Sequence, residues 1–179
     1  MQPKDTIAQF DRYLAQRNLR LEAVVIGGAA LGLLDIVTRQ TRDCDILPPE
    51  LPEEILDASK EFAADMRSRQ VPLRDDWLNN GPTDVAALLP RGWQARLQPA
   101  FGGDAVILQT LGRSDLLKTK LFAYCDRGTD LADCLAFKPT AAELKKALAW
   151  LQKQDAHPDW PRHVEDSLRY LAERLGHEL

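Results

Sequence analysis

The feature that most constrains this chain is a short apolar run that ends in two glycines. The run LEAVVI ends at Ile26, the pair Gly27-Gly28 follows, and the sequence then reads AALGLLD. A continuous apolar run of this length that ends in glycine is typical of a buried strand. We therefore predict a strand at residues 21–27 that passes directly into a short helix at residues 28–35.

The glycine pair is itself a candidate ligand site. Glycine lacks a Cβ atom, so Gly27 and Gly28 let a ligand approach the backbone closely. The free N–H groups at the start of a helix favour a phosphate group. The pattern therefore predicts a phosphate site at this turn. A plain tight turn, with Gly28 and Gly32 allowing close helix packing, explains the same residues, and the glycines alone do not separate the two interpretations.

An acidic strand is predicted next, at residues 44–47, with the sequence CDIL. Asp43 and Asp45 are two positions apart, so their carboxylates project to one face of this strand, while Cys44 faces the core. A hard cation such as Mg²⁺ or Mn²⁺ relieves the repulsion between neighbouring carboxylates. The pair predicts a metal site in which Asp43 and Asp45 are the catalytic residues of a phosphoryl or nucleotidyl transfer. A solvated edge of the sheet is the alternative.

The remaining patterns predict one more strand, AVILQTL at residues 105–111, and several helices. The helices are expected after a cap at Asp5, at residues 52–69, after a cap at Ser114, after Gly128, after a capping box of Thr140 and Glu143, and from Pro161. Strands that alternate with helices, followed by helices alone, predict an α/β fold with a small mixed sheet. We expect an α/β domain at residues 1–137 and a helical C-terminal extension at residues 138–179 packed on it.

Composition excludes several classes of protein. The three cysteines are an odd and sparse set, which argues against a disulfide framework, and none forms a C-x-x-C pair, which argues against a structural zinc site. The net charge of −4 gives no overall basic excess for nucleic-acid binding. No apolar run approaches the ~20 residues of a membrane span, and the first residues lack the apolar core of a signal peptide. We expect a soluble, cytoplasmic protein with no membrane partner.

The order of these motifs resembles the nucleotidyltransferase superfamily, whose signature is a glycine-rich turn followed by a strand of the form D-x-D. The stretch VVIGGAALGLLDIVTRQTRDCDIL at residues 24–47 carries the resemblance. The stretch SDLLKTKLFAYCDRGTDLADCLAF at residues 114–137 is similar to a second family segment, and DDWLNNG at residues 75–81 is a weaker match. The closer resemblance is to a bacterial branch of small proteins, the nucleotidyl transferase AbiEii toxin-like proteins.

This resemblance implies a nucleotidyltransferase-like fold and a Mg²⁺- or Mn²⁺-dependent enzyme. It implies that a nucleoside monophosphate passes from an NTP to an RNA, a protein or a small molecule. It further implies that the chain is the toxin of a toxin–antitoxin pair, with an antitoxin as partner.

The second segment adds positive charge to the expected site. Lys120 and Arg127 fall at spacings that place them on one face of a helix. By resemblance, Lys120 contacts nucleotide phosphates, while Asp130 and Asp133 support the site by pairing with Arg127 or orienting Lys120. An exposed charged helix is the alternative. The resemblance thus assigns nucleotide binding to Gly27, Gly28, Thr41, Lys120 and Arg127.

The chain departs from the family pattern at the third carboxylate. Active members usually carry it on a later strand, where this chain has Gln109. Asp104 lies only at the edge of that strand, and Asp75, Asp76 and Asp84 are less natural substitutes. A catalytically inactive member that binds a nucleotide or a partner is therefore a second hypothesis.

A degenerate dinucleotide-binding unit is a third hypothesis. Gly27, Ala29 and Gly32 form the pattern G-x-A-x-x-G. Ala29 puts a methyl group where a pyrophosphate needs bare backbone, which counts against it.

Overall fold

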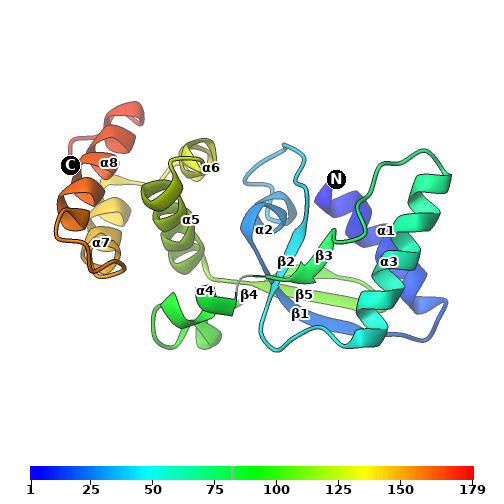
Figure 1. The fold of residues 1–179 in the computed structure, drawn as a ribbon. Coiled ribbons are helices and arrows are strands. Elements are labelled where there is room, and N and C mark those ends of the chain that lie inside the picture. Colours follow the sequence, from blue (N-terminus) through cyan, green and yellow to red (C-terminus); the bar gives the residue numbers. More distant parts are fainter. Residues whose placement is uncertain (82) are drawn as a thin grey trace. The chain divides into compact units, whose positions relative to one another are not determined.

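The computed structural model describes residues 1–81 and 83–179, and it describes no side chain for Thr83 and Asp84. The chain divides into two compact units, Met1–Gly112 and Arg113–Leu179. Figure 1 colours the first from blue to green and the second from yellow-green to red. The first unit contains the sheet, and the second is built of helices. The expected domain boundary at residue 137 stays a prediction.

One mixed five-stranded sheet, with strand order β3-β2-β1-β5-β4, forms the centre of the first unit. β1 is antiparallel to β2 and parallel to β5, while β3 is parallel to β2 and β4 is antiparallel to β5. The predicted α/β class and the three predicted strands are confirmed. The strands are β1 (Leu21–Ile26), β2 (Cys44–Leu47), β3 (Leu78–Asn80), β4 (Gln98–Gly102) and β5 (Val106–Thr110).

The sequence patterns missed β3 and β4, which lie at the two ends of the strand order. β3 is three residues long and lies in a stretch rich in turn residues. β4 contains Pro99, ends at Gly102 and has an irregular register next to that proline. Proline is tolerated in edge strands because it needs no partner for an N–H group. These strands exist because β2 and β5 offer them a pairing edge.

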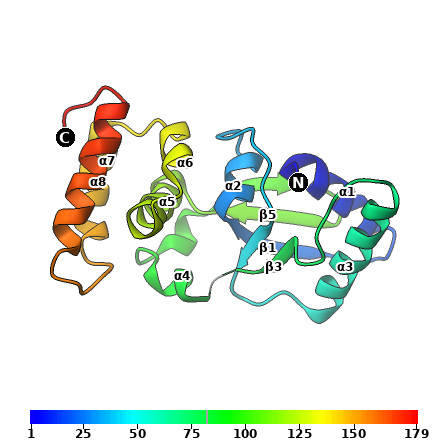
Figure 2. The same cartoon turned by 45° about the horizontal axis from the view of Figure 1, so that its top comes forward.

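Two long helices, α1 (Pro3–Ala15) and α3 (Glu53–Ser68), lie beside each other against the sheet (Figures 1 and 2). The ring of Phe10 lies 5.3 Å from that of Phe62 and 5.1 Å from that of Trp77, measured between centroids. The indole N–H of Trp77 donates to the Ser59 carbonyl at 3.1 Å, so this buried polar group is satisfied. An aromatic cluster thus joins both helices to the start of β3.

Three shorter helical segments complete the first unit: α2 (Gly27–Leu33), α4 (Thr83–Leu88) and a 3₁₀ turn at Trp93–Arg96. α2 follows β1 without a loop, as predicted. The prediction that Asp5 caps the first helix is wrong, because Gln2 occupies the cap and Asp5 lies in the first turn.

The second unit consists of α5 (Arg113–Arg127), α6 (Leu131–Ala136), α7 (Ala141–Leu151) and α8 (Trp160–Arg174). The capping box is confirmed, since the Thr140 hydroxyl accepts from the Glu143 N–H at 3.2 Å and the Glu143 carboxylate accepts from the Thr140 N–H at 2.9 Å. Ser114 lies in the first turn of α5 and is not its cap. Among the described residues, no helix is both long and apolar enough to cross a membrane.

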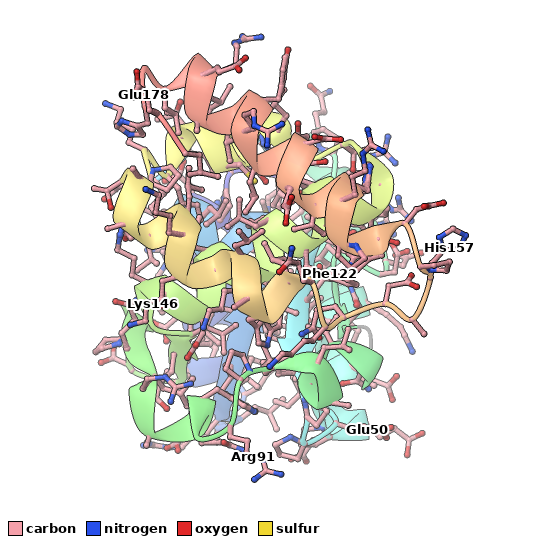
Figure 3. All side chains as sticks on the ribbon, turned by 90° about the vertical axis from the view of Figure 1, so that its left-hand side faces the viewer. Glu50, Arg91, Phe122, Lys146, His157 and Glu178 are labelled. Atoms are coloured by element: carbon pink, nitrogen blue, oxygen red, sulfur yellow. The ribbon has the colours of Figure 1, made fainter. Side chains whose placement is uncertain are left out.

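The three histidines all belong to the second unit. His157 projects to solvent from the loop before α8 (Figure 3). A ring nitrogen of His163 lies 2.8 Å from the Cys125 carbonyl oxygen, and one of His177 lies 3.1 Å from the Pro139 carbonyl oxygen. The His163 ring therefore connects α8 to α5, and the His177 ring connects the C-terminal residues to the link before α7.

A buried carboxylate ties α1 to the turn between β4 and β5. Asp11 is 8% exposed, and its Oδ1 atom accepts from the backbone N–H groups of Ala105 and Val106, both at 2.8 Å. Burial alone would raise the pKa of Asp11, but these backbone donors outweigh it and lower the pKa below the ordinary 3.8. A Cβ atom on Gly103 would lie 2.3 Å from the carboxylate, so the turn needs glycine there.

We predict that Asp11→Asn lowers the free energy of unfolding by about 1–2 kcal/mol, because hydrogen bonds to a charged acceptor are the stronger ones. The pKa of Asp11 is lower in the folded chain. Its stabilisation is therefore complete above the unfolded pKa and is lost as the pH falls through the folded pKa. Urea unfolding at several pH values measures this. The variant should lose stability at neutral pH and match the wild type in acid, whereas Asp104→Asn, an exposed acid in the same turn, should change neither.

Candidate functional site

The pairing of β1 with β2 places a carboxylate beside the glycine turn. Ile26, the last residue of β1, is the direct partner of Asp45 in β2. Gly27 follows with a φ of +71°, and a Cβ atom there would lie 3.1 Å from Asp45 Oδ2. A left-handed φ and a nearby carboxylate both disfavour a side chain at this position. The backbone of Gly27 and the carboxylate of Asp45 therefore lie in contact with each other.

Gly28 faces the loop that leads into β2. A Cβ atom on Gly28 would lie 2.9 Å from Thr41 Oγ1 and 3.6 Å from an Arg39 guanidinium nitrogen. The Thr41 hydroxyl also donates to the Asp43 carbonyl at 3.4 Å. The loop thus returns to the glycine pair and brings a hydroxyl and a cation to it. The sequence analysis did not identify Arg39, although it stands in the same R-Q-T-R-D-C-D stretch as the two aspartates.

Asp43 and Asp45 flank a fully buried thiol. Both aspartates are half-buried, while Cys44 is 0% exposed, so the alternation holds although Asp43 lies one residue before β2. Burial, and then the negative charges of Asp45 and Asp43, raise the pKa of the Cys44 thiol. A thiol that stays protonated is not a metal ligand. The donors at this point are therefore hard carboxylate oxygens.

These residues fit a magnesium ion. Mg²⁺ usually binds one or two carboxylates and takes its other ligands from water and substrate phosphates. Asp43 and Asp45 supply the carboxylates, and the bare backbone at Gly27-Gly28 leaves room for phosphate beside them. α2 is only seven residues long, so close approach to this backbone, more than a helix dipole, favours a phosphate here.

Gln109 occupies the place where a third carboxylate is expected. Directly paired residues of neighbouring strands point to the same face of a sheet. Asp45 is paired with Ile26, and Gln109 with Val24, two positions away on the same strand. Gln109 therefore shares the face of Asp45, with one strand between them, and its side chain is exposed.

Of the other acids that the sequence suggested, none whose side chain the structure describes completes the site. Asp104 precedes β5 at the end of the sheet opposite to Asp45, because β5 runs parallel to β1 and Asp45 pairs with the last residue of β1. Asp75 and Asp76 are exposed and pair with neighbouring arginines at 2.7 and 2.6 Å. The side chain of Asp84 lies outside the described part of the structure. Among the described residues, no three His, Cys, Asp or Glu side chains form a metal-binding group.

Asn79 is a polar neighbour that sequence reasoning missed. It is the direct partner of Asp45 in β3, so its side chain points to the same face. Its amide also donates to the Asp76 carbonyl at 3.3 Å, which restrains the side chain. The weak family match at residues 75–81 contains Asn79, but nothing in that stretch of turn residues sets this residue apart.

The second unit contains a compact ionic cluster. The Lys120 ammonium lies 2.9 Å from Asp130 Oδ1 and 2.8 Å from Asp133 Oδ2. The exposed side-chain fractions of the lysine and these two acids are 9%, 13% and 2%, whereas Arg127, which contacts Asp130 at 3.1 Å, is 62% exposed. The alternative of an exposed charged helix is therefore wrong for Lys120 and Asp133.

The positive and negative charges of this cluster offset one another. Burial raises the pKa of Asp130, but Lys120 and Arg127 outweigh it, so that the net shift is downward. The predicted support of Lys120 by Asp130 and Asp133 is thus present as direct contact. Binding of nucleotide phosphates by Lys120 and Arg127 stays a prediction.

Comparison with known proteins gives the family. A family model described as "Nucleotidyltransferase of unknown function (DUF6036)" matches residues 5–138. The chain belongs to this family. The match includes the glycine pair, the two aspartates and the Lys120 cluster, so the predicted superfamily is confirmed. The AbiEii toxin-like branch stays a prediction.

Comparisons with solved structures and with curated proteins do not extend this family assignment. The crystal structure of an antigenic nucleotidyltransferase-like protein from Paracoccidioides brasiliensis is similar to this chain at 16% identity, covers 92% of each chain and has a TM-score of 0.48. A likeness this distant carries no argument about function. No curated protein matches the chain.

We predict that Gly28→Ala weakens binding of a fluorescent ATP analogue about tenfold, because the new methyl group would displace Thr41, and the loss of one good contact corresponds to that factor. Alanine suits a helix, so the variant should fold and melt no earlier than the wild type. Gly102→Ala is the matched control, since a Cβ atom there meets nothing within 4 Å. Equal affinity of both variants and the wild type would exclude Gly28 from the nucleotide site.

We predict that Lys120→Met lowers the free energy of unfolding by about 3 kcal/mol, because it removes the buried ammonium that contacts both Asp130 and Asp133. Urea denaturation measures the change. Lys146, which extends to solvent from α7 (Figure 3), provides the control, and Lys146→Met should stay within about 0.5 kcal/mol of the wild type. Unchanged stability of Lys120→Met together with lost nucleotide affinity would show a ligand role for the lysine instead.

Proposed function

We propose that this protein is a Mg²⁺-dependent enzyme that transfers a nucleoside monophosphate from an NTP to an acceptor hydroxyl. The proposal is based on the contacts that Gly27 and Gly28 make at the end of β1. A Cβ atom on Gly27 would lie 3.1 Å from Asp45 Oδ2, and a Cβ atom on Gly28 would lie 2.9 Å from Thr41 Oγ1. Family membership supports the reaction class, and the two neighbouring carboxylates support the metal.

In the proposed reaction, these residues would accept a proton and bind the phosphates of the NTP. The acceptor oxygen forms a bond to the α-phosphorus of the NTP, the bond from that phosphorus to the bridging oxygen breaks, and pyrophosphate leaves. The hydroxyl proton passes to Asp43 or Asp45 or to water. The backbone at Gly27-Gly28 holds phosphate oxygens close, and Thr41 and Arg39 contribute a hydroxyl and a positive charge beside them.

Asp43 and Asp45 would hold the metal. When bound, Mg²⁺ supplies positive charge that offsets the charge of the triphosphate and of the leaving pyrophosphate. The half-buried position of both carboxylates keeps them accessible to such an ion. Cys44, buried between them, directs the chain so that both acids face the same way.

The acceptor belongs to the same proposal. The resemblance of residues 24–47 to the AbiEii toxin-like proteins supports an RNA or protein acceptor and an antitoxin partner; a small-molecule acceptor fits the same chemistry.

Incubation with labelled NTPs, Mg²⁺ and pools of RNA and protein tests the reaction. We expect label transfer by the wild type and a loss of at least about 100-fold in Asp45→Asn, since even the neighbours of metal ligands contribute 10- to 100-fold. Asp57→Asn, an exposed acid on α3, is the matched control and should retain full activity. Full activity of Asp45→Asn, or equal activity of the wild type with and without a chelator, would refute the metal site.

Gln109 favours a second candidate, a member that binds nucleotide without transferring it. The glutamine stands on the face of Asp45 where a carboxylate is expected. This candidate requires metal-dependent binding of ATP by the wild type and no label on any acceptor. If Gln109→Glu then gains transfer, the missing charge accounts for the inactivity. Transfer by the wild type excludes this candidate.

A further inference from the structure

A basic pocket adjoins the loop that carries the predicted nucleotide and metal ligands. It has a volume of about 430 Å³ and lies within the first unit. Its charged lining comes from three segments: Arg42 beside the two aspartates, Arg67 near the end of α3, and Arg74 just before β3. Among the described residues that line it, none is acidic. In a chain with a net charge of −4, this is a local concentration of positive charge.

Two of the three arginines are hydrogen-bonded within the chain and still have donors available for a ligand. Arg67 donates to the Leu73 carbonyl and to Asp75, and Arg74 donates through two nitrogens to Asp76. These aspartates are 67% and 62% exposed. Exposed ion pairs contribute little to stability, so exchanging one for a stronger anion costs little. A guanidinium has five N–H donors, and donors therefore remain for a ligand.

The pocket and the candidate site share one residue, Thr41. Thr41 lines the pocket and is also the residue that lies against Gly28. Arg42 directly precedes Asp43 in the sequence. Hydrogen bonding to Asp76 raises the pKa of Arg74, and the charge of Asp43 contributes to the same shift, which places this arginine within electrostatic reach of that aspartate. A group bound in the pocket would thus lie against the loop that leads to the two aspartates.

We propose that this pocket is a second phosphate-binding site, separate from the backbone at Gly27-Gly28. Clustered arginines bind phosphate oxygens in pairs of parallel hydrogen bonds. The proposal rests on the proposed function only for the source of the phosphate. That source is either the polyphosphate of the NTP or a backbone phosphate of a nucleic-acid acceptor, which share the same chemistry.

Calorimetric titration of the whole chain with inorganic pyrophosphate, without metal, tests the site itself. We expect Arg42→Gln and Arg74→Gln each to weaken binding about fivefold, and the affinity of the wild type to fall with added salt, since exposed charges are screened. Arg20→Gln is the matched control. Arg20 is an exposed arginine at the start of β1, at the opposite end of that strand from Gly27, and its variant should bind as the wild type does. Absence of binding at millimolar pyrophosphate, or equal binding by all variants, overturns the proposal.

Two further titrations distinguish the sources. A non-hydrolysable ATP analogue and a short single-stranded RNA without terminal phosphates are titrated into the same variants. If the arginine variants weaken only the analogue, the pocket holds the polyphosphate; if they weaken only the RNA, it holds the acceptor backbone. If they weaken neither, the pyrophosphate site has no substrate role and the proposal fails.

Asp45→Asn separates this proposal from the proposed function. Its carboxylate belongs to the metal site and does not line the pocket. The variant should therefore lose transfer while it binds metal-free pyrophosphate as tightly as the wild type. If the protein is active and its arginine variants bind pyrophosphate normally, the pocket proposal alone fails. If the protein is inactive and its pyrophosphate binding depends on the arginines, the proposed reaction alone fails.

Discussion

The antiparallel pairing of β1 with β2 is the constraint on which the candidate site depends. It places Asp45 opposite Ile26, so the carboxylate meets the chain where the strand ends at Gly27. A shift of one residue in this register would turn Asp45 to the core and Cys44 to the site, because side chains alternate along a strand. The buried thiol and the neighbouring aliphatic residues of β2 therefore hold the aspartates at the surface.

The charged clusters of the two units differ in how far they are buried. In the second unit, Lys120 is enclosed with Asp130 and Asp133, so its charge is balanced locally and contributes to packing. In the first unit, the carboxylates of Asp43 and Asp45 are only half-buried, which leaves them accessible to a cation or a substrate. This difference separates a structural cluster from a candidate site, although both are rich in acids.

The candidate metal site has only two carboxylates among the described residues. Mg²⁺ accepts two protein carboxylates when phosphates complete its coordination, but a second metal needs shared ligands. Gln109 faces the same side of the sheet as Asp45 and brings an amide instead of a charge. The proposed transfer would therefore depend on substrate phosphates, and on the cations near Thr41, more than transfer at a site with three acids would.

By itself the sequence determined the central strands, most helices and the capping box at Thr140, because these follow from short-range periodicity and local hydrogen bonds. It also indicated that Gly27 and Asp45 act together. Only the tertiary structure decided the edge strands, the approach of Arg39 and Asn79, and the enclosure of Lys120. These depend on pairing and burial between distant segments, and a local pattern of residues carries no information about which distant segment lies opposite.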